Sequence, residues 1–387
     1  MAKTGKTGAE AGIEIVMPRE GGPEVLTVVR RGALRGPKAG EAVVRVEAAG
    51  VSFAEVQMLR GRYFNQPKFP VVPGYDLVGT VEEIGEGVDE GLLGKRVAAL
   101  TETGAWADRV AIGAEKLATV PDGLDPADAV AVITNGVTAW QMVHRAAKVR
   151  PGQTVIVHGA SGGVGTLLVQ LARLAGAEVI GTASASKHET LRALGAVPID
   201  YRNEDVPKRV REISPDGVDA VFDHVGGPGL VDSWRVLRRG GTLVSYGSAS
   251  TLRGTGHRLW PYLPIVARTL LWSVLPNGKR ATFYFVKRWP TLFREDLSTV
   301  FSLLAEGKIE ARVDRRLPLE RAAEALGLLA SGKASGKVVL VPGLGAESEE
   351  QRSQTQRHTP SPVTPSATSP SREDDTEASQ PRGSEER

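Results

Sequence analysis

The chain contains no cysteine among its 387 residues. This absence excludes disulfide bridges, zinc sites built on thiolates and cysteine nucleophiles. Histidine is scarce as well, and its six copies follow neither the H-x-x-x-H nor the H-E-x-x-H spacing of metal-binding helices. We therefore expect the histidines to serve in packing or at the surface rather than as metal ligands.

Long apolar runs are also missing. No stretch reaches the roughly 18 apolar residues of a membrane-spanning helix, so none is predicted. The first twelve residues carry two lysines with no apolar segment behind them, unlike a secretory signal. We expect a cytoplasmic protein.

Aromatic residues are absent from residues 344–387, which are rich in Ser, Thr, Pro, Glu and Gln and contain nine acidic and five basic residues. Such a segment buries too little apolar surface to offset the entropy that ordering costs. We predict a disordered tail over 344–387 and a shorter flexible N-terminus over 1–12.

The sequence between these ends falls into two parts. Residues 13–135 contain short β-like runs separated by glycine and proline, such as EAVVRVEAAGV and DLVGTVEEIG. Residues 151–247 alternate apolar strand patterns with helical ones, beginning with TVIVHGA and GVGTLLVQLARLA. This alternation predicts an α/β fold with a doubly wound parallel sheet and helices on both faces.

The most informative segment is the glycine loop, Gly159-Ala160-Ser161-Gly162-Gly163-Val164-Gly165, which joins a strand pattern to a helix pattern. It is a variant of the dinucleotide-binding fingerprint, with alanine in place of the first glycine. Gly162 would let the backbone approach a pyrophosphate, and Gly165 would let the helix pack against the strand. The start of the helix offers free N–H groups to the phosphates. The candidate cofactor-binding residues here are Ser161, Gly162, Gly163, Val164 and Gly165.

Two other interpretations of the glycine loop stay open. Residues 159–163 also satisfy G-x-S-x-G, the nucleophile elbow of serine hydrolases, which requires an acid and then a histidine later in the chain. The downstream histidines are few, namely His188, His224, His257 and His358, and the last lies in the predicted tail. The second alternative is a glycine turn that binds no ligand.

The next strand pattern, 178–184, distinguishes between the nicotinamide cofactors. NAD-selective sites place Asp or Glu at the end of this strand, where the ribose 2′-hydroxyl binds. This chain has Ser184 and Lys187 there and no acid before Glu189, and Tyr201 ends the following strand. Hydroxyls and a lysine suit a 2′-phosphate, so Ser184, Lys187 and Tyr201 predict NADPH.

Four segments together resemble the medium-chain dehydrogenase/reductase family, in its zinc-free quinone-oxidoreductase branch. They are GVSFAE with RGRY within 50–63, PGYDLVG at 73–79, the glycine loop, and GKVVLVPG at 336–343. The resemblance covers roughly residues 13–343. The runs GVSFAEV, GTASASKHE, PIDY and ISPDGVD are particularly similar to the vesicle amine transport protein 1-like group.

The resemblance implies a GroES-like β-barrel domain for 13–135 and 295–343, and a Rossmann NADPH-binding domain for 136–294. It also implies a homodimer. Zinc members of the family carry Cys, His and Glu where this chain has Ser52, Tyr75 and Asp76, so the resemblance implies no zinc. It further places Thr138 near the nicotinamide, and Tyr246 and Gly247 at the border of the same end.

Without a metal to polarise an alcohol, the expected reaction is hydride transfer from NADPH to a substrate that is already electrophilic. A quinone or an α,β-unsaturated carbonyl compound fits this description. Negative charge then develops on a carbonyl oxygen, which needs a hydrogen-bond donor. Tyr63 is a candidate proton donor or substrate contact, with loop packing as its alternative role. Ser52 is the second catalytic candidate and stands where quinone reductases of this branch often have Asn.

A basic and aromatic stretch runs from 233 to 294, with eleven Lys or Arg, no acidic residue and ten of the chain's twenty aromatics. We interpret its middle, 250–290, as an insertion in the Rossmann domain that forms a lid over a hydrophobic substrate. Subunit contact and peripheral membrane contact are the alternatives. No motif indicating nucleic-acid binding accompanies the charges, so no nucleic-acid partner is expected.

The sequence thus predicts a zinc-independent, NADPH-dependent oxidoreductase that reduces hydrophobic quinones or enones. The competing hypothesis is a non-catalytic nucleotide-binding protein that associates with membranes or lipids.

Overall fold

The computed structural model describes residues 12–32, 34–247, 249, 260 and 262–344. The predicted flexible N-terminus lies outside these residues except for Gly12, and the predicted disordered tail lies outside them except for Leu344. Residues 250–259 of the predicted insertion lie outside them as well.

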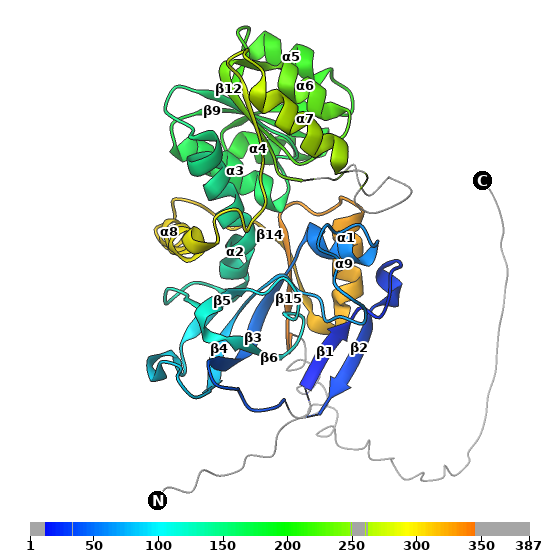
Figure 1. Cartoon of the computed structure of the whole chain (residues 1–387), viewed down its shortest axis with the longest axis vertical. Helices are drawn as coiled ribbons and strands as arrows, with labels where there is room; N and C mark the ends of the chain where they lie inside the picture. The colour runs from blue at the N-terminus through cyan, green and yellow to red at the C-terminus, as the bar shows by residue number, and fades with distance from the viewer. Residues whose placement is uncertain (1–11, 33, 248, 250–259, 261, 345–387) are drawn as a thin grey trace, which may run out of the picture. The chain divides into compact units, whose positions relative to one another are not determined.

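The N-terminal domain is a β-barrel built on a seven-stranded sheet in the order β14-β15-β3-β4-β5-β7, with β6 paired to β3. These strands are β3 (Glu41–Val51), β4 (Asp76–Ile84), β5 (Arg96–Leu100), β6 (Arg109–Gly113), β7 (Ala118–Thr119), β14 (Val313–Pro318) and β15 (Lys337–Val341). A separate two-stranded sheet pairs β1 (Gly12–Val16) with β2 (Thr27–Arg31). The late strands β14 and β15, orange in Figure 1, lie beside the early, blue strand β3. The chain therefore returns to its first domain.

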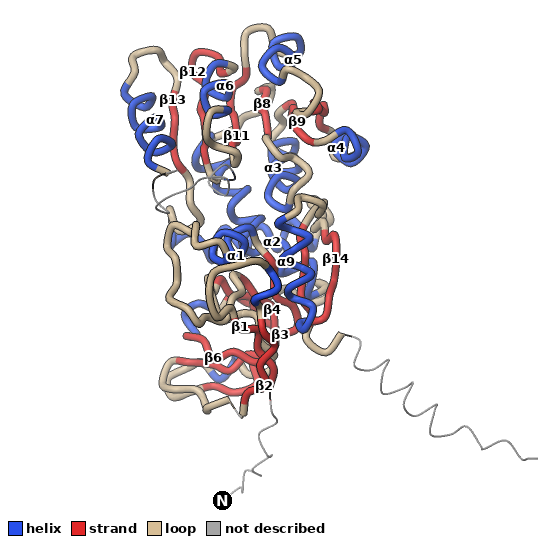
Figure 2. Tube along the Cα trace, turned by 90° about the vertical axis from the view of Figure 1, so that its right-hand side faces the viewer, coloured by secondary structure: helices blue, strands red, loops and turns tan. Residues whose placement is uncertain are grey.

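The barrel core follows from the alternating apolar residues of its strands. Val44, Leu77, Val97 and Val338 are buried from four different strands. Trp106 is fully buried among them, and its indole Nε1 donates a hydrogen bond to the Gly50 carbonyl at 3.0 Å, as a buried tryptophan requires. Two short helices, α1 (Phe53–Leu59) and α9 (Ala322–Ala330), lie side by side on the barrel (Figures 1 and 2).

The second domain is built on a six-stranded parallel sheet in the order β10-β9-β8-β11-β12-β13. Its strands are β8 (Thr154–Val157), β9 (Glu178–Ala183), β10 (Ala196–Asp200), β11 (Val218–Asp223), β12 (Leu237–Ser245) and β13 (Arg280–Phe283). The helices between them are α3 (Gly163–Leu174), α4 (His188–Ala193), α5 (Val206–Ile213), α6 (Gly229–Arg235) and α7 (Leu263–Val274). This is the doubly wound Rossmann order, in which ligands bind where the strand order reverses. The reversal lies between β8 and β11.

Helices cover both faces of this sheet, as the strand–helix alternation predicts. Val155 and Val157 of β8 pack in one cluster with residues of α3, whereas Ile156 between them packs with residues of α5, α6 and α7. Because both faces are buried, β8 is a continuous apolar run rather than an alternating one.

Helix α2 (Pro126–Trp140) connects the two domains, because it contacts β3, β4 and β5 of the barrel as well as α3 (Figure 2). It begins at Asp125, whose carboxylate accepts hydrogen bonds from the N–H groups of Ala127 and Asp128. It continues as a π-helical segment, Gln141–Ala147. Helix α8 (Phe293–Ala305) packs against α2, where the buried Asp296 accepts hydrogen bonds from Trp140 and Gln141 and pairs with Arg145.

The described part of the predicted insertion corrects the sequence interpretation. Helix α7 and strand β13 form the last crossover unit of the parallel sheet, with β13 paired to β12. Trp272 of α7 stacks on Trp234 at a centroid distance of 4.9 Å. Basic and aromatic residues therefore occur here within a regular strand–helix unit, and of the described residues between 260 and 290 those that line the cavity described below follow β13. Within the described ranges, no helix has both the length and the apolar character needed to span a membrane.

Candidate active site

A cavity of about 1200 Å³ lies between the carboxyl ends of the parallel strands and the barrel. It is lined by every residue that the sequence predicts for the site. These are Ser52, Tyr63, Thr138, Ser161, Gly162, Gly163, Val164, Gly165, Ser184, Lys187, Tyr201, Tyr246 and Gly247. Residues from 52 to 247 thus converge on one space, as expected at the switch point of a doubly wound sheet.

The glycine loop connects β8 to α3, and two of its glycines make room for close packing. A β-carbon at Gly165 would overlap the Gly159 carbonyl oxygen, and one at Gly163 would lie 2.5 Å from the Asn135 side-chain amide. Gly162 is the N-cap of α3 in an extended conformation, with no side-chain cap. The first N–H groups of α3 have no acceptor within the helix, so they are available to an anion at the cavity wall.

The nucleophile-elbow interpretation requires a later histidine bonded to Ser161, and among the described residues neither His188 nor His224 is hydrogen-bonded to that serine. His158, which lies three residues before Ser161, is hydrogen-bonded through its two ring nitrogens to Thr182 and Ser233 instead. Ser161 itself is buried, at 7% exposure. The loop is therefore arranged as a nucleotide cradle rather than as the exposed serine of a hydrolase.

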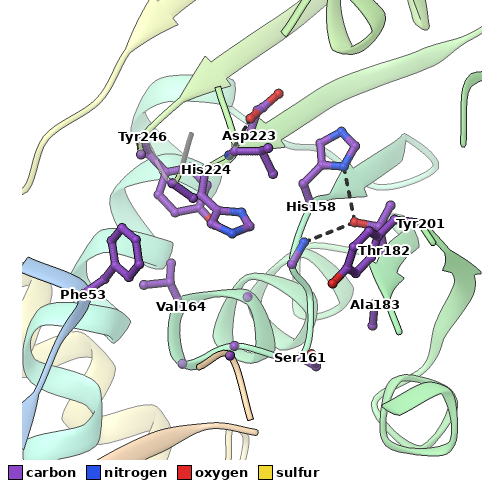
Figure 3. Close-up of a pocket in the computed structure, with 18 of the residues that line it drawn as sticks. Phe53, His158, Ser161, Val164, Thr182, Ala183, Tyr201, Asp223, His224 and Tyr246 are labelled. Carbon is purple, nitrogen blue, oxygen red and sulfur yellow. Dashed lines mark hydrogen bonds between the residues drawn. The ribbon is translucent and has the colours of Figure 1, made fainter. Parts of the chain in front are cut away.

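A chain of hydrogen bonds links the ends of β9, β8 and β11, and Figure 3 shows the part of it that joins His158 to Thr182. Ser233 Oγ donates to Asp223 Oδ2 at 2.6 Å, so Ser233 Oγ accepts from the Nε2–H of His158 at 3.1 Å. The Nδ1 atom of His158 then accepts from the Thr182 hydroxyl at 3.3 Å. Burial lowers the pKa of His158, which agrees with the neutral ring that this pattern needs.

His224 is a further cavity residue that the sequence interpretation assigned to packing. Its ring points into the space beside Val164 and Tyr246 in Figure 3, and its buried Nδ1 atom has no hydrogen-bond partner in the described structure. An unpaired buried nitrogen is costly, so it marks a position for a ligand donor. The available sequence signal was that His158 and His224 each directly follow a parallel strand, at its carboxyl end.

The predicted 2′-phosphate residues lie at the end of β9 and β10. Ser184 Oγ is 3.3 Å from Ser186 Oγ, and the guanidinium of Arg202 lies over the Tyr201 ring at 5.8 Å. Lys187 Nζ donates to the Ala334 carbonyl at 2.7 Å, and burial lowers the pKa of this lysine. Lys187 therefore also ties the nucleotide domain to the barrel, a contact that the sequence did not reveal.

The barrel side of the cavity holds a cluster of polar groups. The hydroxyls of Tyr63 and Tyr75 are hydrogen-bonded at 2.9 Å, and burial raises the pKa of Tyr63 to about 12. Lys337 Nζ lies 3.0 Å from Ser52 Oγ and 3.2 Å from Asp76 Oδ2. The sequence interpretation missed Lys337, which is 3% exposed and lines the cavity.

The described residues contain no group of three or more His, Asp or Glu side chains that could hold a metal ion. Ser52, Tyr75 and Asp76 lie near one another, and the carboxylate of Asp76 is paired with Lys337. Aromatic and aliphatic side chains complete the wall, including Phe53 and Val286. The arrangement can bind a dinucleotide along the strand ends and a largely apolar molecule against the tyrosines.

Comparison with known proteins finds two family models that match successive parts of the chain. Residues 38–149 match the family described as alcohol dehydrogenase GroES-like domain, and residues 194–340 match the family described as zinc-binding dehydrogenase. The synaptic vesicle membrane protein VAT-1 homolog of Rattus norvegicus is 34% identical over 318 residues, which span 79% of this chain and 78% of that protein. The homolog of Homo sapiens is 33% identical over the same length, 79% of this chain and 80% of that protein.

Solved structures give the same picture. The quinone oxidoreductase of Escherichia coli complexed with NADPH has a TM-score of 0.75 and 29% identity, covering 85% of this chain and 100% of that one. The human VAT-1 homolog-like protein has a TM-score of 0.73 and 29% identity, covering 86% of this chain and 98% of that one.

Proposed function

The chain belongs to the medium-chain dehydrogenase/reductase family, of the VAT-1 and quinone oxidoreductase type, and from that premise we propose that it is a zinc-independent, NADPH-dependent reductase of quinones or α,β-unsaturated carbonyl compounds. The observation that carries this proposal is a cavity shared by the two domains. A glycine cradle faces it from the Rossmann domain, and a cluster of hydroxyl donors faces it from the barrel. A hydride donor and an electrophilic carbonyl compound fit these two sides.

The residues present fit a dinucleotide. Gly162, Gly163 and Gly165 line the cavity without side chains, and the start of α3 supplies N–H groups for the pyrophosphate. The unpaired Nδ1 of His224 offers a further polar contact within the cavity. When bound, NADPH supplies the hydride, while the chain orients it and excludes water.

The phosphate preference is proposed from the end of β9. No acidic residue stands there to hold a ribose 2′-hydroxyl, and Ser184, Lys187 and Tyr201 line this part of the cavity. Lysine and hydroxyl groups suit a 2′-phosphate. The NADPH complex of the E. coli quinone oxidoreductase supports the same choice.

Zinc independence is proposed from the chemistry of the side chains. Serine and tyrosine hydroxyls, at Ser52 and Tyr75, are poor zinc ligands in proteins compared with Cys and His. The carboxylate of Asp76 is paired with the buried Lys337. A second cation would have to displace this ion pair.

Tyr63 is proposed as the proton donor. Its pKa of about 12 keeps the hydroxyl protonated at neutral pH, and Tyr75 holds that hydroxyl by a hydrogen bond. Tyr63 lines the cavity on the barrel side, so its proton can reach a substrate oxygen there.

The experiment that tests the proposal is a binding titration followed by turnover. NADPH and NADH are titrated into the purified protein by nicotinamide fluorescence, and NADPH oxidation is then measured with 1,4-naphthoquinone and with trans-chalcone. We expect tighter binding of NADPH and turnover with at least one acceptor. Absence of binding by either nucleotide would refute the reductase.

A second candidate function is contact with a lipid surface, favoured by helix α7. Leu263, Val266, Leu270 and Val274 form one exposed face of this helix, and Val274 is 77% exposed. No acidic residue occurs between 233 and 294, whereas eleven basic ones do. An apolar helix face within a basic stretch of the sequence is complementary to an anionic membrane, and we propose that occupant for it.

This contact is tested by co-sedimentation with vesicles of phosphatidylcholine and phosphatidylserine. Leu270→Glu should abolish binding, whereas Leu174→Glu, which alters an exposed leucine on α3, should leave it intact. No binding to anionic vesicles would refute the membrane contact. If Leu270→Glu instead converted a dimer into a monomer in light scattering, a second copy of the chain would be the occupant, and the predicted homodimer would use this face.

A further inference from the structure

We propose that the buried ammonium of Lys337 is a fixed cation that aims and polarises the hydroxyl of Ser52 toward the carbonyl oxygen of the substrate. Ser52 is then the catalytic donor to that oxygen, and Lys337 is a positioning residue that acts through it. The inference rests on the proposed reductase function and specifies the group that the substrate must offer, a carbonyl oxygen.

The strand pairing of the barrel places Lys337 next to Ser52. Lys337 begins β15, which pairs antiparallel with β3, so that Val338 lies opposite Val51. The two side chains are 285 residues apart in the sequence, and their Nζ and Oγ atoms are 3.0 Å apart. Gly50 makes room for this arrangement, because a β-carbon there would overlap the Asp76 carboxylate and lie 2.6 Å from Lys337 Nζ.

The direction of each hydrogen bond follows from the chemistry of the groups. An ammonium can only donate, so Ser52 Oγ accepts from Lys337 and its own proton stays available for a third group. The Lys337 Nζ atom also lies 3.3 Å and 3.2 Å from the two Asp76 oxygens. Its three protons are thereby used, which is why Lys337 reaches the substrate through Ser52 rather than directly.

The neighbouring carboxyl groups do not cancel the positive charge of Lys337. Asp76 is fully buried and also accepts hydrogen bonds from the N–H and hydroxyl of Thr134, so its charge is shared among several donors. Glu55 is the other carboxyl group near the pair. Burial raises the pKa of Glu55 to about 8, so near neutral pH it is mostly protonated and does not cancel the cation.

The cavity places this donor where charge develops. Ser52 and Lys337 line the same space as Tyr63 and the residues of the glycine loop. A hydroxyl that accepts from an ammonium is a stronger donor than a free hydroxyl. Preorganised donors of this kind, placed in a partly closed site, stabilise an oxyanion without reorganising during the reaction.

The electron balance for an enone is as follows. The substrate's β-carbon accepts a hydride, with its two electrons, from the cofactor, which leaves oxidised. The C=C pair moves to join the α-carbon and the carbonyl carbon, and the C=O π pair moves onto the oxygen. Ser52 holds that oxyanion by a hydrogen bond, and Tyr63 transfers a proton to it to give the enol. Solvent returns the proton to Tyr63.

The test compares kcat and KM for reduction of 1,4-naphthoquinone and trans-chalcone, together with the Kd for NADPH. Ser52→Ala should lower kcat about 100-fold, as loss of one oxyanion donor does, with KM and the NADPH Kd nearly unchanged. Ser52→Thr keeps the hydroxyl and should restore most of the rate. Lys337→Met should lower kcat to a similar degree, and the double variant should be no slower than either single variant, because both remove one unit.

A matched control separates this role from a purely structural one. Arg145→Met breaks the ion pair of another buried carboxylate, Asp296, and neither of these two residues lines the cavity. It should lower the melting temperature without lowering kcat. If Lys337→Met fails to fold, Lys337→Arg keeps the charge with altered geometry and should lower kcat while retaining NADPH binding.

Three outcomes overturn the inference in different ways. Unchanged kcat in Ser52→Ala removes the catalytic donor, although the reductase function stands. Losses that multiply in the double variant show that Lys337 does not act through Ser52. A wild-type protein that oxidises NADPH with neither acceptor refutes the proposed function, and this inference with it.

Discussion

Glu55→Gln is the substitution whose effect on stability can be worked out most fully. Glu55 is fully buried in α1, and burial raises its pKa from the ordinary value of 4.5 to about 8. Its Oε2 atom accepts a hydrogen bond from the Ser52 N–H at 2.8 Å, and its Oε1 atom has no partner in the described structure. The folded protein therefore keeps a proton that the unfolded chain loses above pH 4.5.

The sign and size of the effect follow from proton linkage. Between pH 4.5 and about 8 the folded state binds more protons at this site, so the free energy of unfolding falls as the pH rises. It levels off above the folded pKa. At about 1.4 kcal/mol per pH unit, the whole interval corresponds to a loss of about 5 kcal/mol. Glutamine does not titrate, so the variant lacks this slope.

Glutamine brings a constant cost of its own. Its carbonyl must face the Ser52 N–H, which places an NH₂ group with two unpaired hydrogens where the protonated wild-type carboxyl has one. That costs about 1–3 kcal/mol at every pH. The stability curves of the wild type and Glu55→Gln should therefore cross between about pH 5 and 7, with the variant less stable below the crossing and more stable above it.

The assay is urea unfolding at pH 5, 7 and 9, with the difference in unfolding free energy taken at each pH so that other titrating groups cancel. Glu83→Gln, at an exposed position on β4, is the control and should give a small difference that does not change with pH. A constant difference between wild type and Glu55→Gln across this range would refute the raised pKa and the neutral carboxyl inferred from it.

Three further predictions concern the cavity. Lys187→Glu should weaken NADPH binding about 10- to 100-fold and NADH binding far less, because only NADPH has the 2′-phosphate. The control, Lys116→Glu, should leave the binding of both nucleotides unchanged. If Lys187→Glu weakened the binding of both nucleotides equally, the phosphate assignment would be contradicted. Gly165→Ala should destabilise the fold by about 1–3 kcal/mol and abolish nucleotide binding, because the methyl group overlaps the Gly159 carbonyl. The control is Gly327→Ala in α9, where the methyl group has free space and should leave the melting temperature nearly unchanged. Equal losses of melting temperature in the two variants would argue against a tight glycine loop. Tyr63→Phe should lower kcat about 100-fold without changing the NADPH Kd, and an unchanged kcat in steady-state assays would leave Tyr63 as a packing residue.

Local patterns were sufficient to predict the strands and the nucleotide cradle. The run EAVVRVEAAGV was predicted as a strand, and β3 covers the same residues, 41–51. The glycine loop was recognised because strand, turn and helix are contiguous in the sequence. Each of these predictions depends on a segment of about 20 residues or fewer, in which hydrophobic periodicity and turn residues indicate the structure.

Contacts between distant segments could not be predicted in this way. Lys337 meets Ser52 and Asp76 only because β15 pairs with β3, and no local pattern encodes that pairing. His158 was assigned to packing because histidine spacing was judged for metals, whereas its partners Thr182 and Ser233 come from separate crossover units. The segment around α7 was misread as an insertion because its basic and aromatic composition outweighed its helical periodicity.

The position of β15 has a consequence for how the protein is made. This strand lies inside the barrel sheet, between β14 and β3, although residues 337–341 are synthesised after almost all of the rest of the fold. On the ribosome, domains fold as their residues emerge, and here the Rossmann sheet is complete long before the barrel is. A chain released before residue 341 would keep an open barrel with an unpaired edge on β3. If it stopped before residue 337, it would also lack Lys337, so the cluster of Lys337, Ser52 and Asp76 forms only after the fold is otherwise finished.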